Sequence, residues 1–249
     1  MCGRYTLTRQ DKIAEDFEAA LGDEPQEEWW KPRYNVAPTQ PAPVVVQARG
    51  GREGGGDGGG RKIRMMRWGL VPHWSGPGGK RAPLMINARS ETLEAKAVFR
   101  DALRRRRCLV PADGFFEWVR DPSAGAKAKP QPIYMRPASG RLVGFAGLWE
   151  RAPGDGSEQL SFTIITGKPN ELVKPYHDRM PAIVDPGAYA AWLDPDLSAE
   201  AAHALLGVPP VGDWRADPVS TRVNSATIDD PACIEPLVIE PAAQRSLFE

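Results

Sequence analysis

Residues 108–118 read CLVPADGFFEW and contain two of the strand signals that decide the fold class. The runs 108–111 and 115–118 are short blocks of apolar and aromatic residues beside Pro, Asp and Gly, a pattern typical of strands. Similar runs follow at residues 133–135, 142–149 and 160–166. Because these signals do not alternate with helical segments, they predict an α+β fold with a largely antiparallel, barrel-like β core flanked by helices.

Four segments outside this region are predicted to be helical. Between Thr8 and Gly22, apolar residues recur every four positions, which predicts a helix over residues 8–21 with Thr8 as its N-cap. Residues 90–107 begin with acidic side chains and end with basic ones, as the helix dipole favours. Two shorter helices are expected at residues 186–193 and 198–206.

Two more strands, at residues 43–49 and 62–70, enclose a glycine-rich segment. Residues 50–60 hold eight glycines among eleven positions, and their spacing matches no phosphate-binding loop. We expect a flexible hairpin connection there, and a second hairpin tip at residues 123–130.

The chain of 249 residues is expected to form one domain over residues 1–240, followed by a tail at 241–249. Its three cysteines lack C-x-x-C spacing, which argues against a disulfide framework or a thiolate zinc site. No secretory signal and no membrane-spanning apolar run is found. These features predict a soluble, cytoplasmic protein that works as a monomer without cofactor or metal.

The net charge of zero conceals a strong asymmetry along the chain. Residues 185–249 contain eleven acidic side chains against three arginines, so residues 1–184 carry a net charge of +8. Arginines cluster at residues 104–107, and basic residues again at 61–67. A basic body is compatible with nucleic acid bound on one face. The alternative is that residues 104–107 simply place cations at a helix end.

Cys2 is the residue with the most distinctive chemistry. Trimming of Met1 would leave a 1,2-aminothiol, with reference pKa values of about 8 for the amine and about 8.5 for the thiol. Both groups would then be partly deprotonated near neutrality. The amine can condense with an aldehyde and the thiol can close a thiazolidine ring. The alternative chemistry is acyl transfer, with the amine acting as base for the thiol.

Several other segments are polar or aromatic where a plain core strand would alternate. Glu117 stands between Phe116 and Trp118, so it either faces solvent or lies inward, where burial would raise its pKa. Asn87, Arg89 and Glu91 precede a predicted helix N-terminus, a position that favours anions such as phosphate. The ordered set of motifs is RYNVAPTQ (33–40), WGLVPHWS (68–75), INARSET (86–92), PADGFFEW (111–118), TG-x-P-N (166–170), YHDRMPAIV (176–184) and PVSTRVN (218–224).

Together with Cys2-Gly3-Arg4-Tyr5, this ordered set resembles the SOS response-associated peptidase family, from Cys2 to about Leu237. The resemblance implies a protein that shields abasic sites in single-stranded DNA, including junctions with duplex, by covalent attachment. It is implied to be a DNA–protein crosslinking enzyme that removes its own Met1, with an associated AP-lyase activity. When bound to DNA, it would be associated with the nucleoid.

The resemblance also assigns roles to individual residues. Cys2 would be the nucleophile, Asn87 would position its amine and the sugar, and Glu117 would be the general acid and base. His177 would assist proton transfer at the sugar oxygen. DNA contacts are expected from three groups of side chains, namely Arg4, Arg89 and Arg179 at phosphates, Trp68 and Trp74 at bases, and Asn35 and Trp118 beside them.

Two alternatives remain open from the sequence alone. A Met-Cys-Gly start also resembles glutamine amidotransferases, so the chain could be an N-terminal-nucleophile amidohydrolase that releases ammonia from glutamine. It could also be a passive single-stranded DNA binder in which Cys2 is incidental. Substitution of Cys2 by alanine would leave DNA interaction unchanged only in the second alternative.

Overall fold

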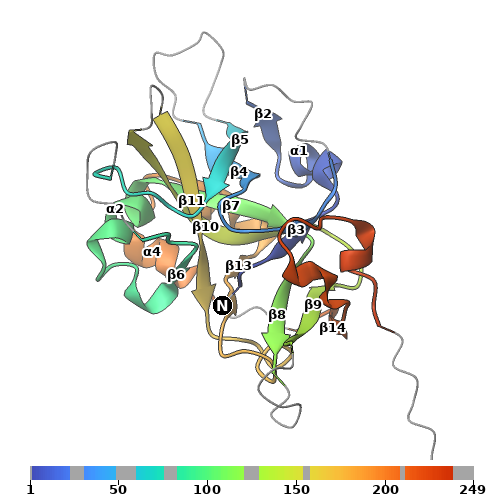
Figure 1. Cartoon of the computed structure of the whole chain (residues 1–249). Helices are drawn as coiled ribbons and strands as arrows, with labels where there is room; N and C mark the ends of the chain where they lie inside the picture. The colour runs from blue at the N-terminus through green and yellow to red at the C-terminus, as the bar shows by residue number, and fades with distance from the viewer. Residues whose placement is uncertain are drawn as a thin grey trace, which may run out of the picture.

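Five strands close into a barrel at the centre of the molecule (Figure 1). They are β4 (Pro41–Gln47), β5 (Arg61–Trp68), β7 (Arg107–Ala112), β10 (Val143–Pro153) and β11 (Glu158–Gly167). Antiparallel pairs run in the order β5-β4-β7-β10-β11. The ring is closed by a parallel pairing of β11 with β5, in which Ser161 faces Arg67 and Phe162 faces Trp68.

This computed structural model describes residues 2–22, 31–48, 60–75, 83–120, 129–153, 158–207 and 211–237. A second sheet of five antiparallel strands lies beside the barrel, in the order β14-β9-β8-β1-β3. Its members are β1 (Tyr5–Leu7), β3 (Arg33–Val36), β8 (Gly114–Val119), β9 (Gln131–Pro137) and β14 (Trp214–Pro218). Because β8 follows β7 after one residue, the chain passes from the barrel into this sheet within the 108–118 stretch.

Short elements cover the two sheets. The barrel is extended by β2 (Ala19–Leu21), β6 (Asn87–Arg89), β12 (Met180–Pro181) and β13 (Ile183–Val184). The α-helices are α1 (Ile13–Asp16), α2 (Ala97–Arg105), α3 (Tyr189–Leu193) and α4 (Ala199–Ala204). The 3₁₀ helices are η1 (Gln10–Lys12), η2 (Ser90–Thr92), η3 (Pro186–Ala188), η4 (Thr221–Asn224) and η5 (Pro231–Cys233). Within the described ranges, no helix is long and apolar enough to cross a membrane.

Aromatic side chains fill the core where the amino-terminal strand meets the barrel. The Tyr5 ring packs edge-on against Trp68 at 5.3 Å, and Trp68 stacks on Phe162 at 6.4 Å. All three side chains are completely buried. Burial of aromatic rings of this size is a main source of core stability, so the residues that follow Cys2 are held firmly in place.

The predicted α+β class and barrel-like core are confirmed, as are the five strands of residues 108–166, the strands near 43–49 and 62–70, and the helices near 186–193 and 198–206. The predicted hairpin segments lie almost wholly outside the described residues, although the strands that flank them pair antiparallel. Residues 241–249 also lie outside the described ranges, so the proposed domain boundary stays a prediction.

The predicted helix over residues 8–21 is wrong in its second half. Thr8 does not cap it, because its N–H and hydroxyl both bind the Asp113 carboxylate, at 2.5 and 2.7 Å. Helix α1 ends at Asp16, and Glu18 adopts a left-handed φ of 48° that redirects the chain. Residues 19–21 then pair with β5 as a strand. The four-residue spacing is real, but tertiary pairing overrides it.

The second predicted helix begins later than its sequence suggests. Lys96 has an extended backbone, so α2 starts at Ala97, and residues 90–92 form only a 3₁₀ turn. The expectation that Asn87, Arg89 and Glu91 precede a helix N-terminus, and so an anion site, is therefore not met by this geometry.

The arginine run at residues 104–107 divides into two pairs. Arg104 and Arg105 are exposed, whereas Arg106 binds Glu150 at 2.8 Å. Arg107 is buried and donates to the carbonyl oxygens of Leu103, Arg104, Trp192, Asp194 and Leu197. This arginine therefore ties the end of α2 to α3 and the loop after it.

Arg107→Met is expected to lower the free energy of unfolding by about 3 kcal/mol or more, because it leaves several buried carbonyl groups without donors. Urea denaturation measures the loss. Arg105→Met removes the same charge from an exposed position and should change stability by no more than about 0.5 kcal/mol. Equal effects of the two substitutions would contradict the structural role of Arg107.

Candidate functional site

The four candidate catalytic residues come together at the start of the amino-terminal strand. Asn87 Nδ2 donates to the carbonyl oxygen of Cys2 at 2.8 Å. His177 Nε2 lies 4.0 Å from Glu117 Oε2. The pKa of the Cys2 thiol is raised first by burial and then by the charge of Glu117. The Cys2–Asn87 pair is therefore close enough to the Glu117–His177 pair for their charges to interact. Residues separated by up to 175 positions thus form one cluster of thiol, amide, carboxyl and imidazole.

Cys2 is held by the strand that follows it. Phe116 N–H donates to the carbonyl oxygen of Arg4 at 3.0 Å, and the Cys2 thiol donates to the same oxygen at 3.6 Å. In the register of β1 with β8, Tyr5 lies opposite Phe115. The thiol is completely buried, so the expectation of a partly ionised thiol near neutrality does not hold here. Burial disfavours the thiolate.

Glu117 lies inward, which settles the choice that its alternation with aromatics left open. The residue is only 2% exposed, since β8 is covered on both faces over most of its length. Burial raises the pKa of Glu117 to about 7, and the charge of the amino terminus acts in the opposite direction. A carboxyl with this pKa can both donate and accept a proton near neutrality.

His177 has two competing partners at one ring nitrogen. The Arg179 N–H donates to His177 Nδ1 at 2.9 Å, while Asp178 Oδ1 lies 2.8 Å from the same atom. A neutral ring that accepts from Arg179 carries its proton on Nε2, toward Glu117. Burial lowers the pKa of His177, and this favours the neutral ring near pH 7.

The residues expected to contact DNA fall into different environments. Trp74 is 55% exposed and Arg89 is exposed, so both present surface to a ligand. Trp118 is half-buried and donates from Nε1 to Asn224 Oδ1 at 2.6 Å. Because they are exposed, Trp74 and Arg89 are the main candidates for DNA contact.

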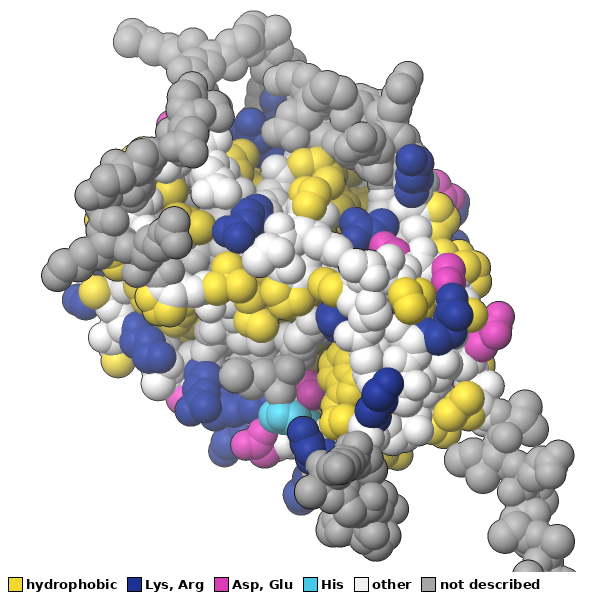
Figure 2. Space-filling view, in the orientation of Figure 1, with side chains coloured by type: hydrophobic (Ala, Val, Ile, Leu, Met, Phe, Trp, Pro, Cys, Tyr) yellow, Lys and Arg dark blue, Asp and Glu magenta, His cyan; other side chains and the backbone are white. Residues whose placement is uncertain are grey.

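The face of the molecule drawn in Figure 2 carries more Lys and Arg side chains than Asp and Glu side chains.

Asn35 and Trp68 are each 0% exposed, so neither side chain is available to DNA in this structure. Trp68 Nε1 donates to the carbonyl oxygen of Ile86 at 2.9 Å. Neither Gly69, which follows Trp68, nor Pro72 further along the motif predicts from the sequence that the Trp68 side chain is buried. We assign both Asn35 and Trp68 to the scaffold that holds the site.

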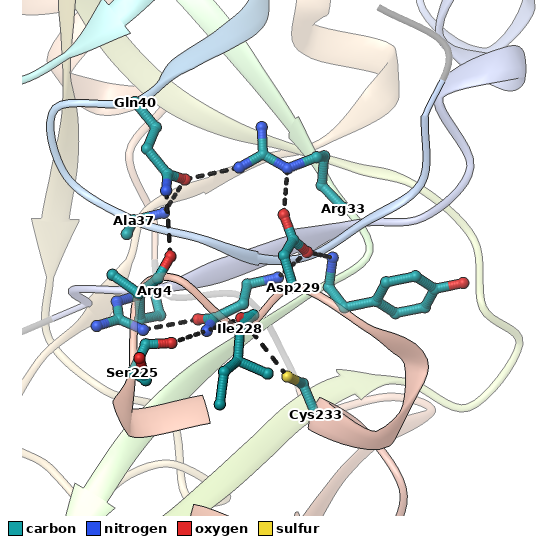
Figure 3. A network of polar contacts seen from close by, with 11 residues as sticks. Arg4, Arg33, Ala37, Gln40, Ser225, Ile228, Asp229 and Cys233 are labelled. Atoms are coloured by element: carbon teal, nitrogen blue, oxygen red, sulfur yellow. Dashed lines mark hydrogen bonds and ion pairs between the residues drawn. The ribbon is translucent and has the colours of Figure 1, made fainter. Parts of the chain in front are cut away.

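Arg4 and Asn35 belong to a polar network that joins the amino-terminal strand to the segment 223–229 (Figure 3). Arg4 Nη1 donates to Asn35 Oδ1 at 2.7 Å and to the Val223 carbonyl at 2.6 Å. Asp229 accepts from the backbone N–H of Tyr34 and of Asn35, and pairs with Arg33. The network fixes the segment directly before β1, which carries Cys2 and Arg4.

Sequence reasoning missed Asp229 and Asn224 and assigned Glu91 only to a helix start. Asp229 and its partners lie more than 190 positions apart, so no local pattern could reveal them. Glu91 is in fact the partner of Arg179, at 2.6 Å. In the part of the chain that the structure describes, no group of three or more His, Cys, Asp or Glu side chains is placed to hold a metal ion.

The fold and this cluster define a class of α+β barrel proteins with a buried cysteine site at the amino-terminal strand. The chain belongs to the SOS response associated peptidase (SRAP) family, whose family model matches residues 1–226. The resemblance seen in the ordered motifs is thereby confirmed.

Relatives of known name cover most of the chain. It is 37% identical over 239 residues to the abasic site processing protein YoqW of Bacillus subtilis, which covers 94% of this chain and 99% of the relative. It is 33% identical over 230 residues to the abasic site processing protein HMCES of Xenopus tropicalis, with 84% and 68% of the two chains covered.

Solved structures show the same fold. A protein from Bacteroides thetaiotaomicron superposes with a TM-score of 0.78 at 22% identity, over 95% of this chain and 100% of that chain. A protein from Bordetella bronchiseptica gives 0.69 at 25% identity, over 88% and 100%. The two solved structures therefore share the overall fold of this chain.

Proposed function

We propose that this protein processes abasic sites in single-stranded DNA, including junctions with duplex, by forming a covalent thiazolidine crosslink through Cys2. The observation that carries the proposal is the cluster of Cys2, Asn87, Glu117 and His177 at the amino-terminal strand. Family membership and the names of the relatives support the choice of abasic sites as substrate. Removal of Met1, by the protein's own chemistry in this proposal, exposes the amine of Cys2.

The reaction balances with loss of one water. The Cys2 amine attacks the aldehyde carbon of the ring-opened deoxyribose, and the resulting carbinolamine loses water to give an imine. The thiol sulfur then adds to the carbon of the protonated imine, and the thiol proton goes to the Glu117 carboxylate that was left when its acid form protonated the departing hydroxyl. The five-membered ring leaves no imine to promote β-elimination, so the strand stays intact. Strand cleavage by the associated AP-lyase activity would compete only before ring closure.

Glu117 serves both proton transfers in this scheme. As a protonated acid it donates to the hydroxyl that leaves the carbinolamine. As the resulting carboxylate it accepts the proton of the buried thiol, whose high pKa otherwise keeps it neutral. A pKa of about 7 suits a group that must hold and release a proton in one cycle.

Asn87 and His177 position the reacting groups. The Asn87 amide already holds the Cys2 carbonyl, and its Oδ1 is buried without a hydrogen-bond partner in the described part of the chain. That oxygen is available to accept from the Cys2 amine or a sugar hydroxyl. The Nε2–H of His177 would donate to the sugar oxygen beside Glu117 and help the ring to open.

The direct test is incubation of purified protein with single-stranded DNA that contains one abasic site, followed by a denaturing gel. We expect a shifted band whose tryptic peptide carries the sugar on Cys2. Intact mass should show that Met1 is absent from the active protein. The absence of any shifted band with protein that lacks Met1 would overturn the proposal. Release of ammonia from glutamine instead would support the amidohydrolase alternative.

Arg89→Ala and Trp74→Ala are expected to weaken binding of single-stranded DNA in different ways. Loss of Arg89 should lower the salt slope by about 0.7, because one phosphate contact is lost. Loss of Trp74 should reduce affinity by about 1–3 kcal/mol with an unchanged slope, since base stacking is uncharged.

Fluorescence anisotropy over a salt series separates these two effects. Arg105→Ala is the matched control, because it removes another exposed arginine, at the end of α2. If Arg105→Ala lowers the slope as much as Arg89→Ala, the DNA path includes the arginine run and is not confined to the Cys2 site.

A further inference from the structure

An ion pair joins the segments that follow Asn87 and His177. Arg179 Nη1 lies 2.6 and 2.7 Å from the two carboxylate oxygens of Glu91. The Arg179 side chain is only 19% exposed. Burial acts to raise the pKa of Glu91, but the hydrogen bond from Arg179 and other contacts outweigh it, and the pKa lies below its ordinary value. Glu91 is therefore ionised and paired at neutral pH.

This pair spans the end of strand β11. On one side, β6 pairs with β11 so that Thr166 faces Arg89, and Glu91 follows two residues later. On the other side, β12 pairs with β11 so that Thr166 faces Pro181, and Arg179 stands just before β12. The ion pair thus ties together the two strands that flank β11 at the level of the site.

Arg179 also controls the ring of His177 through its backbone. Its N–H donates to His177 Nδ1 at 2.9 Å, which leaves the proton of the neutral ring on Nε2, 4.0 Å from Glu117. If this N–H moves away, Asp178 Oδ1 at 2.8 Å is ready to accept a proton from Nδ1 instead. The neutral ring would then carry its proton on Nδ1 and would have no donor toward Glu117.

We propose that Glu91 is a positioning residue that, by holding Arg179, keeps His177 in the tautomer with its proton on Nε2. The tautomer rests on the contact of the Arg179 N–H with Nδ1, whereas its effect on reaction rate rests on the proposed function. The groups that face His177 are Glu117 from β8 and Asp178 and Arg179 beside it. His177 also lines a cavity of about 610 Å³ together with Lys168, Glu171, Lys174 and Tyr176.

The test is ¹⁵N NMR of the histidine ring nitrogens at a pH where His177 is neutral. Wild-type protein should show the Nε2–H tautomer for His177, and Glu91→Gln should shift the population toward Nδ1–H. The chain has two other histidines, His73 and His203, whose signals serve as internal references. An unchanged His177 tautomer in folded Glu91→Gln protein would overturn the inference.

Two control variants test whether the change in the His177 tautomer comes from loss of the Glu91–Arg179 ion pair and not from a general change in structure. Glu94→Gln removes the same charge from an exposed position in the same segment and should leave the tautomer and the crosslinking rate unchanged. Glu91→Asp should restore part of the wild-type tautomer. If Glu91→Gln does not fold, Arg179→Lys takes its place, since an ammonium cannot bind the carboxylate in the same geometry.

Crosslinking gives a second, separate readout. Glu91→Gln should lower the maximal rate of crosslink formation by about tenfold or more and change its pH profile, because the wrong tautomer costs catalysis. A tautomer shift without any crosslinking by wild-type protein would retain this inference and reject the proposed function. Crosslinking at an unchanged rate despite a tautomer shift would show that the Nε2 proton is not used.

Discussion

Cys2→Ala is expected to abolish the denaturant-resistant complex with abasic single-stranded DNA. Alanine is also small enough for a cellular methionine aminopeptidase to remove Met1, and the variant is used after intact mass shows that Met1 is absent, so that it keeps the free amine and loses only the thiol. It can form the imine but cannot close the ring, and the imine hydrolyses when the protein is denatured. A denaturing gel without reductant should therefore show no shifted band, whereas borohydride should trap one.

The other cysteines supply the control. Cys233 is buried in a small separate cluster with Phe116 and Val223, and Cys233→Ala should crosslink at the wild-type rate. Cys2→Ala protein that still gives a stable band without borohydride would contradict the thiazolidine. Cys2→Ala protein that binds abasic DNA exactly as wild type does, with no covalent product from either, would instead favour the passive binder.

Glu117→Gln is expected to reduce the rate of crosslinking by about 10²- to 10⁴-fold, because the amide can neither donate nor accept the transferred proton. The wild-type rate should fall as pH rises through about 7, where the carboxyl loses the proton that it gives to the leaving hydroxyl. In Glu117→Gln this alkaline limb should be absent. Single-turnover rates from pH 5 to 9 measure both effects.

The same substitution should make the protein more stable at alkaline pH. Burial raises the pKa of Glu117 from about 4.5 to about 7, so the folded state holds a proton that the unfolded state releases. Stability therefore falls as pH rises between these values, and above pH 7 the buried charge costs about 3 kcal/mol. Glutamine removes this cost, and thermal unfolding at pH 8 should show a higher Tm.

A second buried carboxyl provides a control with the opposite sign. Glu150 is 4% exposed and accepts from Arg106 at 2.8 Å. Glu150→Gln weakens this ion pair, so it should lower the Tm at pH 8. If both substitutions lower the Tm, Glu117 is stabilised by its surroundings as an anion, and its role as an acid near neutrality is lost.

Much of the fold is predictable because the strands of residues 107–167 carry local signals that agree with their tertiary setting. The helix over residues 8–21 fails because Ala19 to Leu21 find a partner in β5, a contact that no local pattern contains. The start of the helix in residues 90–107 fails for a similar reason, since the backbone at Lys96 is extended.

In the candidate site too, some features can be predicted from local sequence and others depend on tertiary contacts. The motifs identify Cys2, Asn87, Glu117 and His177 as residues with useful chemistry, and the structure places them in one cluster. The motifs do not distinguish the exposed Trp74 from the buried Trp68, although both stand in WGLVPHWS. Exposure depends on what packs against a side chain, and for Trp68 this is Tyr5 and Phe162, far away in sequence.

By itself, the sequence determined the α+β class, most strands, the family and the chemical types of the reactive groups, because these depend on local periodicity and on ordered motifs. Only the tertiary structure decided that Glu117 points inward, that the thiol of Cys2 is buried and that Glu91 holds Arg179. The physical reason is that a pKa, a tautomer or an exposed face is set by neighbouring atoms, and here those neighbours come from strands distant along the chain.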